Sequence, residues 1–94
     1  MDNREMLNLK KVENALEIIN ELTPLTYTNK YTGHQEIGLS GQELLNKYPL
    51  LVGKTLGGMY VVDYEKLTVL LLSALHDLQE KLKINNNLKY KPKK

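Results

Sequence analysis

The chain has 94 residues, enough for one small domain, and its lack of cysteine excludes a disulfide framework and a cysteine-ligated zinc site. Its net charge of +2 arises from five lysines after Leu82, because residues 1–82 hold eight basic residues against eleven acidic ones, a net charge of about −3. A nucleic-acid-binding domain needs a basic face on its folded part, so we expect no nucleic-acid partner. The charged start of the chain, with no apolar run behind it, predicts no signal peptide, and no apolar run is longer than Val69–Leu72, so we expect a soluble chain with no membrane partner.

The first expected element is an amphipathic helix that ends before Pro24. The residue before a proline avoids helical backbone angles, which places the end of the helix there. The opposite face carries glutamates and an asparagine, while the apolar face follows the i, i+3, i+4, i+7 spacing of a helix at Val12, Ala15, Leu16, Ile19 and Leu22.

Two short β-hairpins are expected next, one on each side of a short helix. The first pairs residues 25–30 with residues 36–39 around a turn at Thr32-Gly33. The second pairs residues 50–52 with residues 59–62 around Gly57-Gly58.

A capping box marks the start of the short helix between the hairpins. The hydroxyl of Ser40 can accept the Glu43 amide, and the Glu43 carboxylate can accept the Ser40 amide. The helix runs through Tyr48, and Pro49 stops it.

A long final helix is expected from about residue 64 to about Ile84. Asp63 caps its start, and three consecutive asparagines follow Ile84. We therefore divide the chain into a domain of residues 1–84 and a polar, lysine-rich tail of residues 85–94, which we expect to be mobile.

The final helix is apolar over more than half of its circumference. One stripe steps by four, three and four residues, the heptad spacing of a coiled-coil seam, at Leu71, Leu75, Leu78 and Leu82. Leu67, Leu70 and Ala74 lie beside this stripe. One side of the helix can pack on its own domain and the other needs a partner, although two heptads are equally compatible with a buried helix of a monomer.

Four short blocks resemble the endosialidase-type intramolecular chaperone family. They occur in order at ordinary spacing as LTPLTY (22–27), IGLSGQE (37–43), YPLLV (48–52) and VDYEKL (62–67). The resemblance covers about residues 9–82. It implies an α+β domain of helices and two hairpins that trimerises through its C-terminal helices, at the end of phage tail spikes and fibres. The family that the chain resembles is related to the chaperone domain of myelin regulatory factor.

The resemblance also implies a homotrimer whose client is the preceding fibre or shaft segment, in the host cytoplasm during virion assembly. Members of the family then cut themselves off with a serine at the junction and a lysine five positions later. The same register places Met1 at the serine position and Met6 at the lysine position, with Asp2 and Arg4 as remnants of the motif. A thioether can act neither as the nucleophile nor as the base, so this register leaves no catalytic residue.

Three explanations of the missing dyad stay open. In the first, Met1 is an initiator methionine that replaced the serine. In the second, the chain is a natural non-cleaving variant. In the third, the alignment of the N-terminus with the family motif is shifted. Met6 favours the second, since a start codon does not account for it. A free-standing structural or interaction protein that keeps the fold is therefore the alternative to an assembly chaperone.

Few other residues suggest chemistry. His34 and His76 each lack a second ligand at metal-binding spacing, so we expect no metal site. The sequence likewise predicts no cofactor and no small-molecule ligand.

Overall fold

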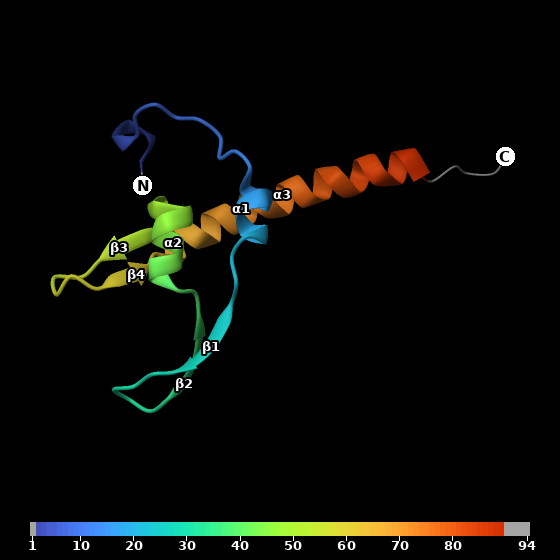
Figure 1. Cartoon of the computed structure of the whole chain (residues 1–94). Helices are drawn as coiled ribbons and strands as arrows, with labels where there is room; N and C mark the ends of the chain where they lie inside the picture. The colour runs from blue at the N-terminus through green and yellow to red at the C-terminus, as the bar shows by residue number, and fades with distance from the viewer. Residues whose placement is uncertain (1, 90–94) are drawn as a thin grey trace.

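The structure, a computed structural model, describes residues 2–89. This part of the chain contains three α-helices, two 3-10 helices and two antiparallel hairpins, which confirms the predicted α+β class with a long C-terminal helix (Figure 1). In chain order the elements are η1 (Asn3–Glu5), α1 (Ala15–Asn20), β1 (Leu25–Thr28), β2 (Gln35–Gly38), α2 (Gly41–Lys47), η2 (Pro49–Leu51), β3 (Val52–Lys54), β4 (Tyr60–Val62) and α3 (Tyr64–Lys89).

The first helix is shorter than predicted. Val12 lies in an irregular segment before it, and α1 begins only at Ala15, after Asn14 adopts a left-handed backbone with φ of 58°. The Asn14 side chain makes no capping hydrogen bond. The amide of Leu16 donates instead to Asp77 Oδ2 of α3, at 3.3 Å, so a distant carboxylate serves the start of this helix.

Both hairpins form around turns close to those predicted. β1 pairs with β2 from Leu25 opposite Gly38 to Thr28 opposite Gln35. In its turn the Asn29 side chain accepts the amides of residues 31 and 32, and Gly33 has a φ of 76°, which suits a residue without Cβ.

The second hairpin starts later than predicted. β3 begins at Val52 and pairs with β4, while Leu50, expected in the strand, lies in η2. Pro49 explains the difference, since its fixed φ suits the first position of a helical turn. Gly58 adopts a φ of 83° in the hairpin turn.

The last helix also departs from its predicted end. α3 continues through the three asparagines to Lys89 instead of stopping near Ile84. Asparagine costs only about 0.7 kcal/mol per residue in a helix relative to alanine and, unlike proline, keeps its amide, so a run of asparagines need not end a helix. Part of the predicted tail is thus helical, and residues 90–94 lie outside the described residues.

The buried core is very small. It consists of one residue each from α1, α2 and η2 and two from α3, namely Ala15, Leu44, Leu51, Leu70 and Ala74. The radius of gyration is 18.2 Å, against about 12 Å expected for a compact domain of this length. In Figure 1 the second half of α3 extends beyond the other elements, and the hairpin of β1 and β2 projects away from them.

Candidate self-association surface

An uncharged strip runs along α3 next to the face that packs on the domain. At about 100° per residue, the buried positions Leu70 and Ala74 fall on one side of the helix. The strip lies about 100° around the helix axis from these buried positions. Along its whole length it carries no aspartate, glutamate, lysine, arginine or histidine. Its residues are Tyr64, Leu67, Thr68, Leu71, Leu75, Leu78 and Leu82.

The four leucines predicted as a seam all lie in this strip and are exposed to solvent. Their exposed fractions are 46% for Leu71, 56% for Leu75, 41% for Leu78 and 52% for Leu82. Isolated exposed leucines are normal on protein surfaces, but four on one side of one helix make a continuous apolar stripe. The stripe is therefore available to a partner, and the structure holds one chain only.

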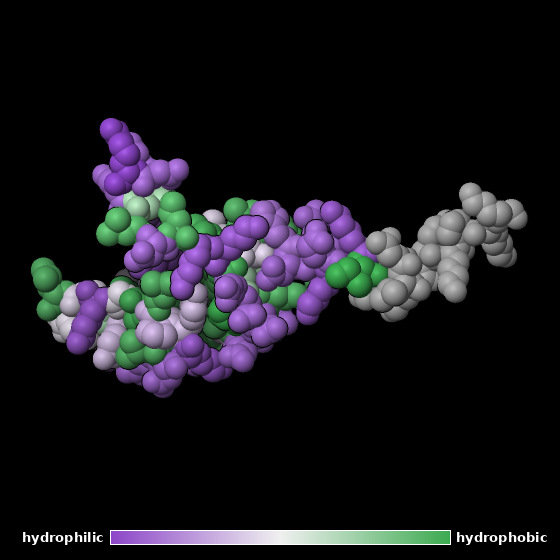
Figure 2. Space-filling model, turned by 90° about the horizontal axis from the view of Figure 1, so that it is seen from above, coloured by the Kyte–Doolittle hydropathy of each residue, from purple (hydrophilic) through white to green (hydrophobic). Residues whose placement is uncertain are grey.

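The whole chain exposes more surface than a compact monomer of its mass. Its accessible area is 8,496 Å², against about 5,500 Å² expected for 10.8 kDa. The exposed leucines of the stripe contribute to this excess. Figure 2 shows apolar patches interrupting the polar surface on the side it presents.

An apolar groove of about 240 Å³ adjoins the strip between α1, the base of the first hairpin and α3. Leu67 and Leu71 belong to both the strip and the groove. The other walls come from the α1 end and from β2, at Ile19, Leu22, Pro24, Gly38 and Leu39. A helix packed on the strip would thus also meet α1 and the hairpin.

Tyr64 fixes the first hairpin against the start of α3. Its hydroxyl accepts the amide of Leu39 at 3.1 Å. A Cβ added at Gly38 would lie 2.7 Å from the same hydroxyl, so glycine allows the strand to approach this closely. The predicted cap at Asp63 is present next to it, where Oδ1 accepts the Lys66 amide at 3.1 Å.

The predicted capping box is half formed. Ser40 Oγ accepts the Glu43 amide at 3.2 Å, as the sequence predicts. The Glu43 carboxylate turns the other way and accepts from Lys47 Nζ at 3.2 Å. Lys47 Nζ also donates to the Glu21 carbonyl at 3.0 Å, which joins α2 to the end of α1.

Asp2 and Arg4, which the resemblance assigns to a cleavage motif, lie at the end of the N-terminal segment. Arg4 donates through both its amide and its guanidinium to the Asp2 carboxylate, with the shortest contact at 2.7 Å. The side-chain hydrogen bond from Arg4 lowers the pKa of Asp2, and the same bond raises the pKa of Arg4. Met6 follows directly as the cap of η1, and Met1 lies outside the described residues. These side chains offer no nucleophile and base.

Metal-binding and membrane-spanning features are not found in the described part of the chain. His34 lies in the first hairpin turn and His76 on an exposed face of α3. Across residues 2–89 no three histidine, aspartate or glutamate side chains gather into a possible metal site. None of the helices described here combines the length and apolarity that a membrane crossing requires.

Sequence reasoning missed two residues that position this surface. Asp77 holds the start of α1, and Tyr64 holds the first hairpin. Asp77 interrupts the apolar face of α3 one turn after Ala74, which is a signal that a buried polar contact exists there. Tyr64 could not be distinguished from any other residue of the first helical turn.

Comparisons with known proteins gave no match. No family model matches the chain, and neither the search of curated proteins nor that of solved structures found a similar one.

Proposed function

We propose that this chain is a homotrimeric assembly domain that brings three copies of a fibre- or spike-like protein together and does not cut itself off. The exposed leucine stripe of α3 is the observation that carries the proposal. Each leucine of the stripe is already at least 41% exposed, so three helices can meet along it without unpacking the core. The number three comes from the resemblance, because leucine at both seam positions is compatible with more than one oligomer.

The small core supports the need for a partner. The five buried residues found in the described part of the chain form a small core, and small domains without disulfides or metals often gain their stability by oligomerising. A partner required for folding must be present wherever the chain is made, and a second copy of the chain meets that condition. Folding and association are then linked by mass action.

The absence of self-cleavage rests on the chemistry of the junction. With Met1 and Met6 at the dyad positions, neither a hydroxyl nor an amine is available where the related domains use them. The Asp2–Arg4 pair is a local contact between exposed side chains, and the hydrogen bond from the Arg4 side chain lowers the pKa of Asp2, which makes its carboxylate a weaker base than a free one.

The test is a fusion in which a fibre segment that trimerises weakly by itself precedes Asp2. We expect the fusion to stay uncut and to yield a folded, protease-resistant trimeric segment. The same fusion with Leu75→Asp should leave the segment protease-sensitive, and with Leu72→Asp it should not. A fusion cut at residue 1 would contradict the non-cleaving claim, and equal protection with Leu75→Asp would contradict the chaperone claim.

A free-standing interaction protein is the second candidate, and the Met6 position favours it. A chain that never has a client to release needs no dyad. In that case the fusion would assemble as a trimer, but the fibre segment would be no better protected than it is alone.

A further inference from the structure

A second apolar groove lies on α3, on the opposite flank from the leucine stripe. Two adjoining hollows of about 260 and 420 Å³ share Val12 and Val69 and form one continuous groove. We call it the arm groove and define it by Tyr48, Leu50, Lys66, Val69, Leu72 and His76.

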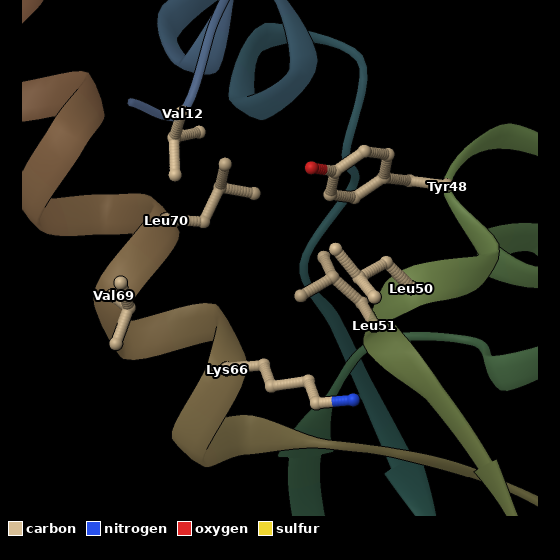
Figure 3. A pocket seen from close by; sticks show the side chains of 7 residues that line it. All are labelled: Val12, Tyr48, Leu50, Leu51, Lys66, Val69 and Leu70. Atoms are coloured by element: carbon tan, nitrogen blue, oxygen red, sulfur yellow. The ribbon is translucent and has the colours of Figure 1, made fainter. Parts of the chain in front are cut away.

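The segment of residues 6–13, here called the arm, crosses this groove at one point. Figure 3 shows Val12 beside Leu70 at one end of the groove, while two other wall residues are left uncovered, Leu50 with 61% and Val69 with 59% of the side chain exposed. Upstream of Val12 the arm leaves the body, and Figure 1 shows it ending above α2. Its two leucines are therefore exposed, Leu7 by 87% and Leu9 by 68%.

We propose that the arm closes over the arm groove of its own chain, with Leu9 packing between Val69 and Leu50. Leu9 lies three residues before Val12, a span of at most about 11 Å, so it can reach the uncovered part. In the view of Figure 1 the arm runs from α1 back toward the side of the molecule on which α3 begins. Because the tether is short, the effective concentration of Leu9 at its own groove reaches the millimolar range.

The backbone and the charges of the arm favour this closure. Asn8 has a φ of 55°, in the left-handed region, so the arm is not extended at that point. With Asn8 in an extended backbone, Leu7 would lie on the same side of the arm as Leu9, since residues two apart share a side of an extended segment. Lys11 lies with Asp77 at one end of the groove, and Glu5 would lie toward Lys66 at the other.

The inference is independent of self-association, because it uses the flank of α3 that the leucine stripe leaves free. Closure would fix the direction in which the chain enters the domain. Any segment joined before Asp2 would then leave along the first half of α3 rather than at an arbitrary angle.

The test uses a chain without native cysteine, so two cysteines can be introduced without competing thiols. In the full chain, Leu9→Cys is combined with Leu50→Cys, and the control combines Leu9→Cys with Leu56→Cys. Leu56, at the tip of the second hairpin, is fully exposed, so greater accessibility would favour the control. We expect the intrachain disulfide to form on the order of 10-fold faster with Leu50 than with Leu56.

Two outcomes would overturn the inference. One is an equal rate for the two pairs, and the other is a disulfide that joins two chains on a denaturing, non-reducing gel. The native mass of the same samples reports self-association separately, so failure of the arm closure is distinguishable from failure of the proposed trimer.

Discussion

The carboxylate of Asp77, in the middle of α3, accepts the backbone amide of Leu16, which lies 61 residues earlier in the chain. The six-residue helix α1 has no side-chain cap of its own, so this carboxylate supplies both a hydrogen-bond acceptor and a negative charge at its positive end. The relationship explains why α1 begins at Ala15 and not near Val12. It also attaches the helix to the element that we propose as the trimer seam.

Asp77→Ala should lower the free energy of unfolding by about 1 kcal/mol, the usual effect of losing an N-terminal cap. Urea unfolding at fixed protein concentration measures this change. The control is Glu80→Ala, which removes a side chain 69% exposed in its contact with Lys83 and should change stability by less than about 0.5 kcal/mol. Equal effects of the two substitutions would contradict the capping role of Asp77.

Tyr64→Phe and Gly38→Ala should each lower the free energy of unfolding by about 1 kcal/mol. The double variant should lower it by clearly less than the sum of the two single effects. The first removes the hydroxyl that accepts the Leu39 amide, and the second pushes the same hydroxyl away. Because both act on one contact, their effects are coupled. Chemical denaturation of all four proteins measures the cycle, and additive effects would show that the contact is not formed.

Ser40→Ala should destabilise α2 by about 1 kcal/mol, whereas Glu43→Ala should cost less than about 0.5 kcal/mol. The Ser40 hydroxyl caps the helix, but Glu43 pairs with Lys47 in an exposed i,i+4 contact instead of closing the box. The unfolding midpoints of the two variants distinguish this arrangement from a complete capping box, in which Glu43→Ala and Ser40→Ala would have similar effects.

The parts of the fold that local chemistry determines were predictable. Gly33 and Gly58 adopt the left-handed angles that their turns need, and Ser40 and Asp63 accept the amides three residues later. The predicted start of α1 was wrong, because the observed start depends on Asp77, which is far away in the sequence. The end of α3 was wrong as well, since asparagine only weakens a helix and does not stop it.

The candidate site could be predicted only as a pattern of residues on one helix. Heptad spacing placed Leu71 and Leu75 on one side of α3, and the structure leaves both exposed. Spacing could not reveal that a groove with Ile19 and Leu39 adjoins the stripe, because those walls come from elements folded next to it. The partner and the number of chains stay predictions.

Leu75→Asp should dissociate the assembly, while Leu72→Asp should not. The two leucines are equally exposed, at 56% and 55%, and are three residues apart on α3, but only Leu75 belongs to the stripe. A carboxylate buried between three helices and without a partner is costly, whereas residue 72 lies outside the stripe and contact along the stripe would not bury it. Sedimentation velocity of the two variants at equal concentration measures the difference. Dissociation by both would place the interface elsewhere, as would dissociation by neither.

The mass of the unmodified chain in solution tests the central claim most directly. Light scattering coupled to size-exclusion chromatography at micromolar concentration should give three times the chain mass of 10.8 kDa, with no stable folded species of lower mass on dilution. A single folded species of 10.8 kDa would contradict the account, because the leucine stripe of α3 would then face solvent in the native protein.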